Sequence, residues 1–333
     1  MASRKLKARR AGSVLVAVVA VAATVVACTR LDLSSLAAAA PGWVAVAVAL
    51  NSAAMLLRAL AWLGMLRTAL PNERVGAAPV VRATMIGVLG SALAPARAGE
   101  PLRVWLVGRS IGRRDRVATV VGTLVSQTLL NVFALALLAA IALPGQLAGH
   151  GRAATLITLG WILTLVLAVL VGARFAARSR LAPHLAALRA GLTVFRPIRR
   201  GLAISGAQLG AWGLQALAAY VLLLALHVQV PAPLATAAAI LVAVNVTAAV
   251  PLAPSNVGIF QAACIGVLAA VGVSSGDALA YGLLLQAAEV ATAVGLGMPA
   301  LASEFAPRRW AAGRAQPDQV SPGGPRAVLD GRS

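Results

Sequence analysis

Long apolar runs separated by short basic segments are the feature that most limits what this chain can form. Several runs approach or exceed the roughly 18 residues typical of a membrane span, including residues 42–66, 117–143, 202–226 and 277–301. Across the chain 60% of residues are hydrophobic and 11% are charged, whereas a soluble domain carries about 25% charged residues. The pattern predicts an all-α integral membrane protein with several spans.

Two stretches interrupt this pattern in the same way, "GSALAPARAGEPLRVWLVGR" from Gly90 and "AAVPLAPSNVGIF" from Ala248. Both contain Leu-Ala-Pro, then three residues, then Gly, so Pro95 and Gly99 recur as Pro254 and Gly258, an offset of 159 (95 to 254, 99 to 258). Proline removes a backbone donor and glycine permits positive φ, so each stretch should break a helix. Broken helices at matching positions of two halves indicate a binding site.

The helix expected before the first break, residues 83–93, is too short to cross about 30 Å of hydrocarbon at 1.5 Å per residue. We therefore expect two re-entrant hairpins, each entering and leaving on one side of the membrane. The second hairpin comprises residues 234–250 and 257–271. Runs at 13–28 and 154–172 bring the predicted number of crossing helices to about six.

The basic residues orient this arrangement. With both termini cytoplasmic, all of the 29 lysines and arginines except Arg30, Arg58 and Arg152 lie on the cytoplasmic side, as the positive-inside rule requires. The formal net charge of +20 belongs to these connections. No basic-aromatic nucleic-acid module is present, so we expect no nucleic-acid partner.

The same offset suggests an internal repeat. It maps the spans 42–66 and 117–143 onto those expected near 202–226 and 277–301. Each unit of span, span, hairpin, span crosses three times, so the two units should have opposite orientations, as in many transporters. Chance similarity between Ala/Leu-rich helices is the alternative.

The predicted organisation has three parts. Residues 1–10 form a basic cytoplasmic arm, residues 11–302 form the transmembrane domain with halves 11–143 and 154–302, and residues 303–333 form a disordered cytoplasmic tail. We expect a multi-pass protein of the plasma (cytoplasmic) membrane.

The first apolar run has two interpretations. It resembles a signal peptide whose "VVAC" ends at Cys28 like a lipoprotein cleavage site. It is also a plausible uncleaved first helix, which we favour because signal h-regions resemble short first spans.

Both broken stretches carry a family resemblance. "LAPARAGEPLR" resembles the P-x-R-x-G-E-x-x-R signature of the lysylphosphatidylglycerol synthase transmembrane-region family, also called flippase-like, which includes the membrane half of the multiple peptide resistance factor. The residues in register are Pro95, Arg97, Gly99, Glu100 and Arg103. "PLAPSNVGIFQAA" resembles the second signature, roughly P-x-x-P-G-G-x-G-x-x-E, more loosely.

The second signature departs from the family in two places. Gln261 stands where the family usually has Glu, and Asn256 stands in a position that is often Gly. The family often has Arg in its last span, where this chain has Gln286. An acid–base pair would then be replaced by two amides, which can hydrogen-bond without burying charge.

The resemblance implies lipid translocation between leaflets or another role in envelope lipid or glycolipid handling. Because only residues 303–333 follow the transmembrane part, we expect the soluble aminoacyl-transfer activity of full-length resistance factors to be absent. The leading expectation is a flippase-like translocase of anionic or glycosylated envelope lipids. The alternative is a non-transporting scaffold or accessory subunit for a lipid-modifying or glycosyltransferase enzyme.

The candidate substrate-binding residues come from both hairpins: Arg97, Glu100, Arg103, Asn256 and Gln261. The planar fork of arginine suits a phosphate headgroup. The alternative is that Glu100 and Arg103 form a structural pair that closes the hairpin.

Two further charges fall inside expected spans. Arg58 either snorkels to the headgroups or faces a polar cavity. Glu289 is either a proton site or a partner for Arg58. Gln127, Asn131, Gln208, Gln215 and Asn245 are expected to make interhelical hydrogen bonds.

The sequence carries no GxSxG, HExxH, P-loop or CxxC motif. Cysteines Cys28 and Cys264 and the scattered histidines match no metal-ligand spacing. We therefore expect no enzyme activity, no metal and no cofactor, with membrane lipids as partners.

Overall fold

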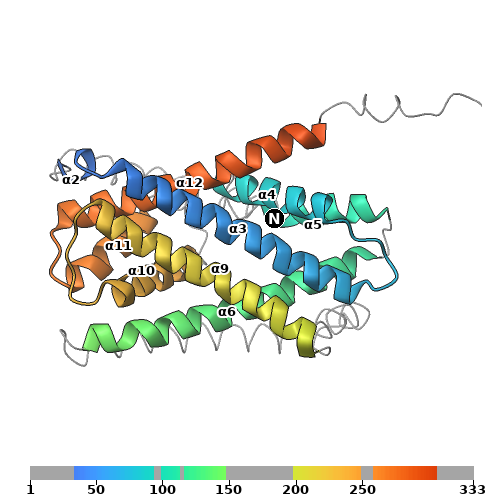
Figure 1. Ribbon diagram of the computed structural model, residues 1–333, viewed down its shortest axis with the longest axis horizontal. Coiled ribbons are helices and arrows are strands. Elements are labelled where there is room, and N and C mark those ends of the chain that lie inside the picture. Colours follow the sequence, from blue (N-terminus) through green and yellow to red (C-terminus); the bar gives the residue numbers. More distant parts are fainter. Residues whose placement is uncertain (1–33, 94–98, 113–115, 148–197, 249–257, 306–333) are drawn as a thin grey trace, which may run out of the picture.

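The computed structural model describes residues 34–93, 99–112, 116–147, 198–248 and 258–305, and these contain helices and no strand. In chain order the helices are α2 (Ser34–Ala37), α3 (Pro41–Ala69), α4 (Ala77–Leu93), α5 (Gly99–Ile111), α6 (Val117–Leu147), α9 (Ile198–Ala225), α10 (Pro233–Ala248), α11 (Ile259–Ala270) and α12 (Ser275–Phe305) (Figure 1). The spans expected at 13–28 and 154–172 and the tail after Phe305 lie outside the described residues.

Four helices are long and apolar enough to cross a membrane: α3, α6, α9 and α12. The expected spans at these places are confirmed, and each helix extends a few residues beyond its apolar run. α3 has 29 residues and α12 has 31, so at 1.5 Å per residue each exceeds the hydrocarbon thickness of about 30 Å.

The helix before the first break begins earlier than expected. α4 starts at Ala77, whereas the sequence predicts a start near residue 83. Pro79 falls in the first turn, where a missing N–H costs nothing. Arg82 therefore lies within the helix rather than in a connection, and its guanidinium is 4.0 Å from the carboxylate of Glu304.

Small residues bring the long helices together. α3 packs along α9 over most of its length, and a Cβ added at Gly64 would lie 2.9 Å from Ile204 Cγ1. A Cβ added at Gly210 would lie 3.3 Å from Leu57 Cδ2. Close approach through small residues is how membrane helices gain packing energy.

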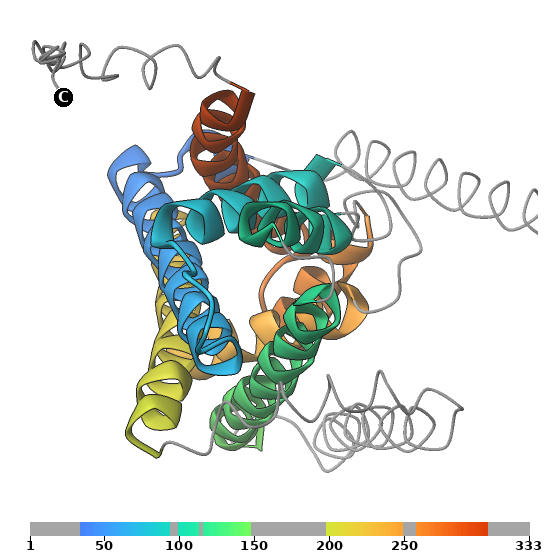
Figure 2. The same cartoon turned by 90° about the vertical axis from the view of Figure 1, so that its right-hand side faces the viewer.

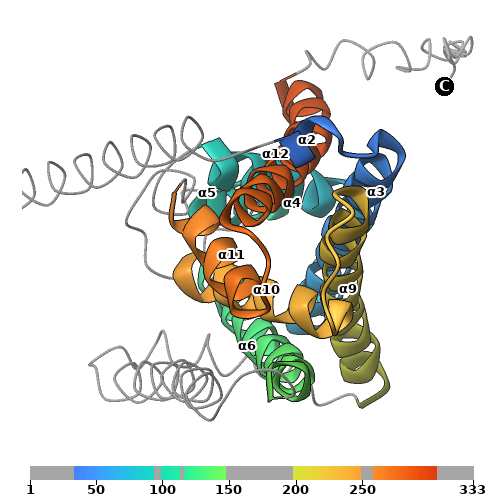
Figure 3. The same cartoon turned by 90° about the vertical axis from the view of Figure 1, so that its left-hand side faces the viewer.

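The helix order long, short, short, long occurs twice, as α3 to α6 and as α9 to α12. The packing between these two sets is reciprocal, because α4 packs against α12 and α10 packs against α6. The views from the two ends show α3 beside α9 on one flank and α12 beside α4 on another (Figures 2 and 3).

The outer face of the bundle is apolar. Phe133, Leu137 and Ile141 are exposed at four-residue spacing along α6, and Leu56 and Leu60 are exposed on α3. Residues at this spacing share one helix face. An exposed apolar face of this length fits contact with lipid chains.

Candidate functional site

Glycine allows close contact between α4 and α5 at the first break. Gly99 begins α5, and a Cβ added there would overlap the carbonyl oxygen of Gly87 and crowd Ser91 Oγ. A Cβ added at Gly90 would lie 3.3 Å from Gly99 Cα. Position 99 therefore requires glycine because the backbones of α4 and α5 approach each other closely there.

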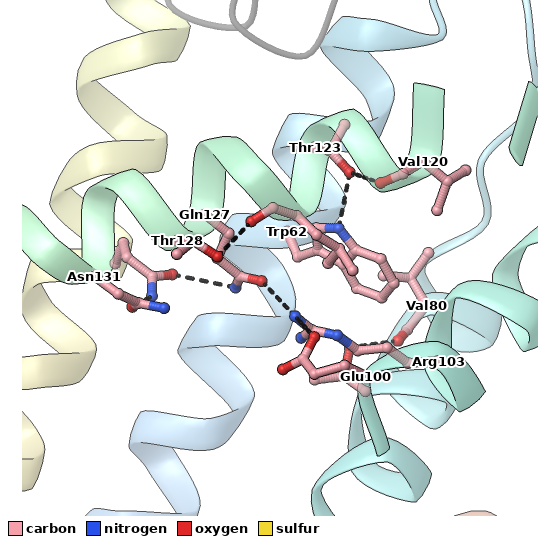
Figure 4. Close-up of polar contacts among 12 residues, drawn as sticks. Trp62, Val80, Glu100, Arg103, Val120, Thr123, Gln127, Thr128 and Asn131 are labelled. Carbon is pink, nitrogen blue, oxygen red and sulfur yellow. Dashed lines mark hydrogen bonds and ion pairs between the residues drawn. The ribbon is translucent and has the colours of Figure 1, made fainter. Parts of the chain in front are cut away.

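Glu100 and Arg103 form an ion pair, as the alternative to a substrate-binding role expects. Arg103 Nη2 lies 2.6 Å from Glu100 Oε2, and the exposed fractions of the two side chains are 14% and 49%. Arg103 Nη2 also donates to Gln127 Oε1 on α6 at 3.1 Å. Its guanidinium lies 4.9 Å from the centre of the Trp62 ring on α3. Arg103 thus reaches into the bundle, while Glu100 stays at its edge (Figure 4).

A row of amides continues from Arg103 between α6 and α9. Gln127 Nε2 donates to Gln208 Oε1 at 3.5 Å, and Gln208 Nε2 donates to Asn131 Oδ1 at 2.6 Å. Trp212 Nε1 donates to the same Asn131 oxygen at 3.0 Å. Gln127 and Asn131 share one face of α6 because they are four residues apart. These predicted interhelical bonds are confirmed.

Trp62 on α3 forms a hydrogen bond with α6. Trp62 Nε1 donates to Thr123 Oγ1 at 3.0 Å, and Thr123 Oγ1 in turn donates to the Val120 carbonyl (Figure 4). This fixes the ring on which Arg103 stacks. Asn245, by contrast, donates to Leu241 O in its own helix α10, so its expected interhelical bond does not appear in the part of the chain that the structure describes.

Arg58 lies at the end of the amide row. Its Nη2 donates to Gln215 Oε1 on α9, and its guanidinium lies 4.5 Å from the centre of the Trp212 ring. The side chain therefore points between α3 and α9 into the bundle. These contacts are at odds with snorkelling to the headgroups, and the other interpretation, that Arg58 faces a polar cavity, stays a prediction.

Glu289 on α12 is a charged neighbour of this arginine. The two side chains interact electrostatically, and both are partly buried. Among the described residues no hydrogen bond or ion pair holds the Glu289 carboxylate. Glu289 therefore interacts with Arg58 without a direct salt bridge in the described part of the chain, and both expectations for Glu289 stay predictions.

Two amide side chains, those of Gln261 and Gln286, form hydrogen bonds next to the second break. Gly258 has φ of 85°, a conformation that glycine adopts without strain. Its backbone N–H donates to Gln261 Oε1 at 2.7 Å, and Gln261 Nε2 donates to Gln286 Oε1 on α12. The expected pairing of Gln261 with Gln286 is confirmed.

The sites on the two hairpins are only partly described. Arg97, Asn256, Pro95 and Pro254 lie outside the described residues. Gln261 is 2% exposed, and its amide is bonded within its own helix start and to α12. No described hydrogen bond links it to Glu100 or Arg103, so its substrate-binding role stays a prediction.

The sequence analysis missed Trp62 and Trp212, on which the two arginines stack. Their spacing was a usable signal. Trp62 follows Arg58 by four residues, and Trp212 follows Gln208 by four, so each ring shares a helix face with a polar side chain.

Within the described ranges, no group of three or more His, Cys, Asp or Glu residues is placed to hold a metal ion. Cys264 is a free, buried thiol on α11. The polar side chains described between α3, α5, α6 and α9 include arginines, amides and indoles, which are hydrogen-bonding groups.

A family model for the lysylphosphatidylglycerol synthase TM region matches residues 11–297. The chain belongs to this family. The match covers both broken stretches and extends into α12, so the resemblance carried by the two motifs is confirmed. For this member of the lysylphosphatidylglycerol synthase TM region family, no curated protein and no solved structure gave a match.

Proposed function

We propose that this protein moves lipids between the two leaflets of the plasma membrane. The observation that carries the proposal is the pair of arginines, Arg58 and Arg103, held inside an apolar bundle by amides and indoles. A charge at membrane depth is expensive, and such residues usually face a substrate or water pathway. The polar row between α3, α5, α6 and α9 would receive the lipid headgroup.

Family membership supports a lipid as substrate. The family takes its name from the membrane region of an enzyme that modifies phosphatidylglycerol. A guanidinium matches phosphate through its planar fork. Anionic or glycosylated envelope lipids are therefore the proposed cargo, carried without a chemical step by this chain and without a cofactor.

The proposed architecture is an inverted repeat with two re-entrant hairpins, α4/α5 and α10/α11. Its support is the repeated helix order and the reciprocal packing of the first short helix of each half, α4 and α10, on the last long helix of the other half. In Figure 1, α3 and α5 end toward the right, while α11 ends and α12 begins toward the left. Hairpins that enter from opposite sides are the plan by which many transporters alternate access.

The proposed orientation follows the charges. Arg67, Arg74, Arg109 and Arg116 lie at or near the end of the bundle where α3 and α5 end and α6 begins. At the other end, the first turn of α12 carries Asp277. The positive-inside rule makes the arginine-rich end cytoplasmic, with both termini on that side.

A second candidate function is a non-transporting scaffold for a lipid-modifying or glycosyltransferase enzyme. It is favoured by the Gln261–Gln286 pair, which satisfies the second break internally. Satisfied interhelical amides are typical of structural contacts.

Translocation can be measured directly in reconstituted vesicles. Vesicles would contain fluorescent phosphatidylglycerol, and a membrane-impermeant quencher would report the fraction in the outer leaflet. The proposal expects faster exchange between leaflets with the wild-type protein than in protein-free vesicles. Exchange at the protein-free rate, with correctly folded protein, would favour the scaffold.

A further inference from the structure

Two arginines, Arg58 on α3 and Arg103 on α5, each stack on a tryptophan ring. Arg58 and Trp62 are four residues apart, so they are neighbours on the same helix face. Arg103 stacks on Trp62 at 4.9 Å, and Arg58 stacks on Trp212 at 4.5 Å. The charge of Arg103 acts on Arg58. Two guanidinium groups of like charge therefore face a shared region between α3, α5 and α9.

Three buried hydrogen-bond donors in this region have no acceptor among the described residues. Arg58 Nε and Arg103 Nε are buried, and neither has a hydrogen-bond partner among the described residues. Asn51 Nδ2 is also buried without a hydrogen-bond partner among the described residues. Asn51 lies seven residues, or about two turns, before Arg58 on α3. A buried donor without an acceptor costs about 1–3 kcal/mol. A ligand that supplies acceptor oxygens would recover that cost.

Stacking fixes the orientation of each guanidinium. A ring against its face leaves the edge of the group, with its N–H donors, available for hydrogen bonds in its own plane. Gln215 takes one donor of Arg58, and Gln127 with Glu100 takes one of Arg103. The remaining edges suit a planar, bidentate contact with an oxyanion.

We propose that Arg58 and Arg103 together bind one phosphate group, the phosphodiester of a lipid headgroup, inside the bundle. The inference rests on the proposed function and deepens it, because it assigns the charge class of the headgroup and the residues that hold it. Trp62 and Trp212 are positioning residues that orient the two guanidinium groups.

The surrounding acids set the strength of the site. Glu100 is ion-paired with Arg103, and Glu289 interacts with Arg58 through space. Because Glu289 lacks a hydrogen-bond partner in the described part of the chain, it acts as a counter-charge that the incoming phosphate must compete with. Neutralising this carboxylate should therefore strengthen phosphate binding.

The test is calorimetric titration of the purified full chain in a non-ionic detergent. Three probes are used: short-chain phosphatidylglycerol, an uncharged glycolipid with the same acyl chains, and inorganic phosphate. Binding in detergent needs no transport, so this experiment fails or succeeds independently of the vesicle assay above.

Arg109 offers a matched control. It is an exposed arginine that stacks on Trp105 at 5.5 Å on α5, so Arg109→Gln removes the same kind of pair outside the bundle. Arg58→Gln and Arg103→Gln should each raise the Kd for short-chain phosphatidylglycerol about tenfold or more, because a charge-assisted contact is lost. Arg109→Gln should change it less than about twofold, as for an exposed charge.

Further variants distinguish a loss of binding from a loss of folded protein. Arg58→Lys and Arg103→Lys keep the charge but lose the fork, and should weaken binding without loss of folded protein. Glu289→Gln should lower the Kd for phosphatidylglycerol.

Wild-type affinity in both glutamine variants would overturn the site, and so would equal loss of glycolipid binding. Inorganic phosphate that binds as tightly as the lipid would overturn the headgroup assignment in favour of free phosphate. Weak competition by inorganic phosphate supports the proposal.

Discussion

Individual polar residues in this bundle differ in how many contacts they make with other helices and in how exposed they are. Arg103 contacts Glu100, Gln127 and Trp62 at once, whereas Glu100 has a half-exposed side chain whose described ion pair is with Arg103 on its own helix. Removing a side chain that bridges three helices should cost more than removing one at the edge. The two members of this ion pair are therefore not equivalent.

Glu100→Gln should be a functional rather than a structural change. A half-exposed ion pair contributes about 1 kcal/mol or less, compared with roughly 3–5 kcal/mol when one side of a fully buried pair is removed. We expect the variant to insert at normal abundance, with a thermal midpoint close to wild type and slower lipid exchange in vesicles. Arg103→Gln is the comparison, and a Glu100→Gln protein that is the less stable of the two would contradict the argument.

The amide pair at the second break makes a sharper prediction. Gln261→Glu places a carboxylate in a 2% exposed position opposite Gln286, whose amide carries no charge. An unpaired buried charge costs several kcal/mol, so abundance and thermal stability should fall. Adding Gln286→Arg restores the acid–base pair suggested by the family resemblance, and the double variant should recover a large part of the loss.

A double-mutant cycle in purified protein would measure this coupling. Additive losses, with the double variant as unstable as the sum of the single ones, would show that the two side chains do not compensate each other.

At this scale the sequence was most informative where a motif could be compared with a family. It predicted that Gln261 and Gln286 could hydrogen-bond, and it gave the Glu100–Arg103 pair as the alternative to a substrate-binding role; both contacts are present. It left Arg58 undecided because hydropathy does not say which way a helix face turns. That decision depends on Gln215 and Trp212, which come from a helix more than 150 residues later.

Glycine allows pairs of helices in this protein to approach closely at a few positions. Gly99 is the tightest, because its backbone meets the Gly87 carbonyl on α4. The sequence predicted a helix break here from Pro95 and Gly99, but it could not show that α5 packs back on α4. The sequence also predicts too late a start for α4, because a basic residue such as Arg82 is typical of a connection between membrane helices.

Gly99→Ala should separate α4 from α5. Its methyl group has no room against the Gly87 carbonyl, and overpacking typically costs about 1–3 kcal/mol. We expect a lower thermal midpoint and disturbed positioning of Arg103, four residues along α5. Gly206→Ala on α9 is the control, since nothing lies within 4 Å of a Cβ added there and alanine favours a helix over glycine by up to about 1 kcal/mol.

Equal stability of the two alanine variants would mean that the α4–α5 contact is not needed for the fold. A drop confined to Gly99→Ala would support it.

At the scale of the whole molecule, the described residues contain the helix order long, short, short, long twice. The sequence suggested this from a constant offset between two short motifs, and the described helices follow the same order twice. What it could not supply is the reciprocal packing of α4 on α12 and α10 on α6. Such contacts join distant segments whose apolar surfaces are alike, so composition alone does not select them.

Opposite entry of the two hairpins predicts opposite labelling of their ends. Ser110 is exposed in the last turn of α5, and Ser275 is exposed where α12 begins after α11. In a background with Cys28 and Cys264 replaced by serine and alanine, Ser110→Cys should react with an impermeant maleimide only from the cytoplasm. Ser275→Cys should react only from outside, because the proposed orientation places the arginine-rich end in the cytoplasm. Both cysteines reacting from the same side would contradict the inverted repeat, since two hairpins that enter from one side cannot form halves of opposite orientation.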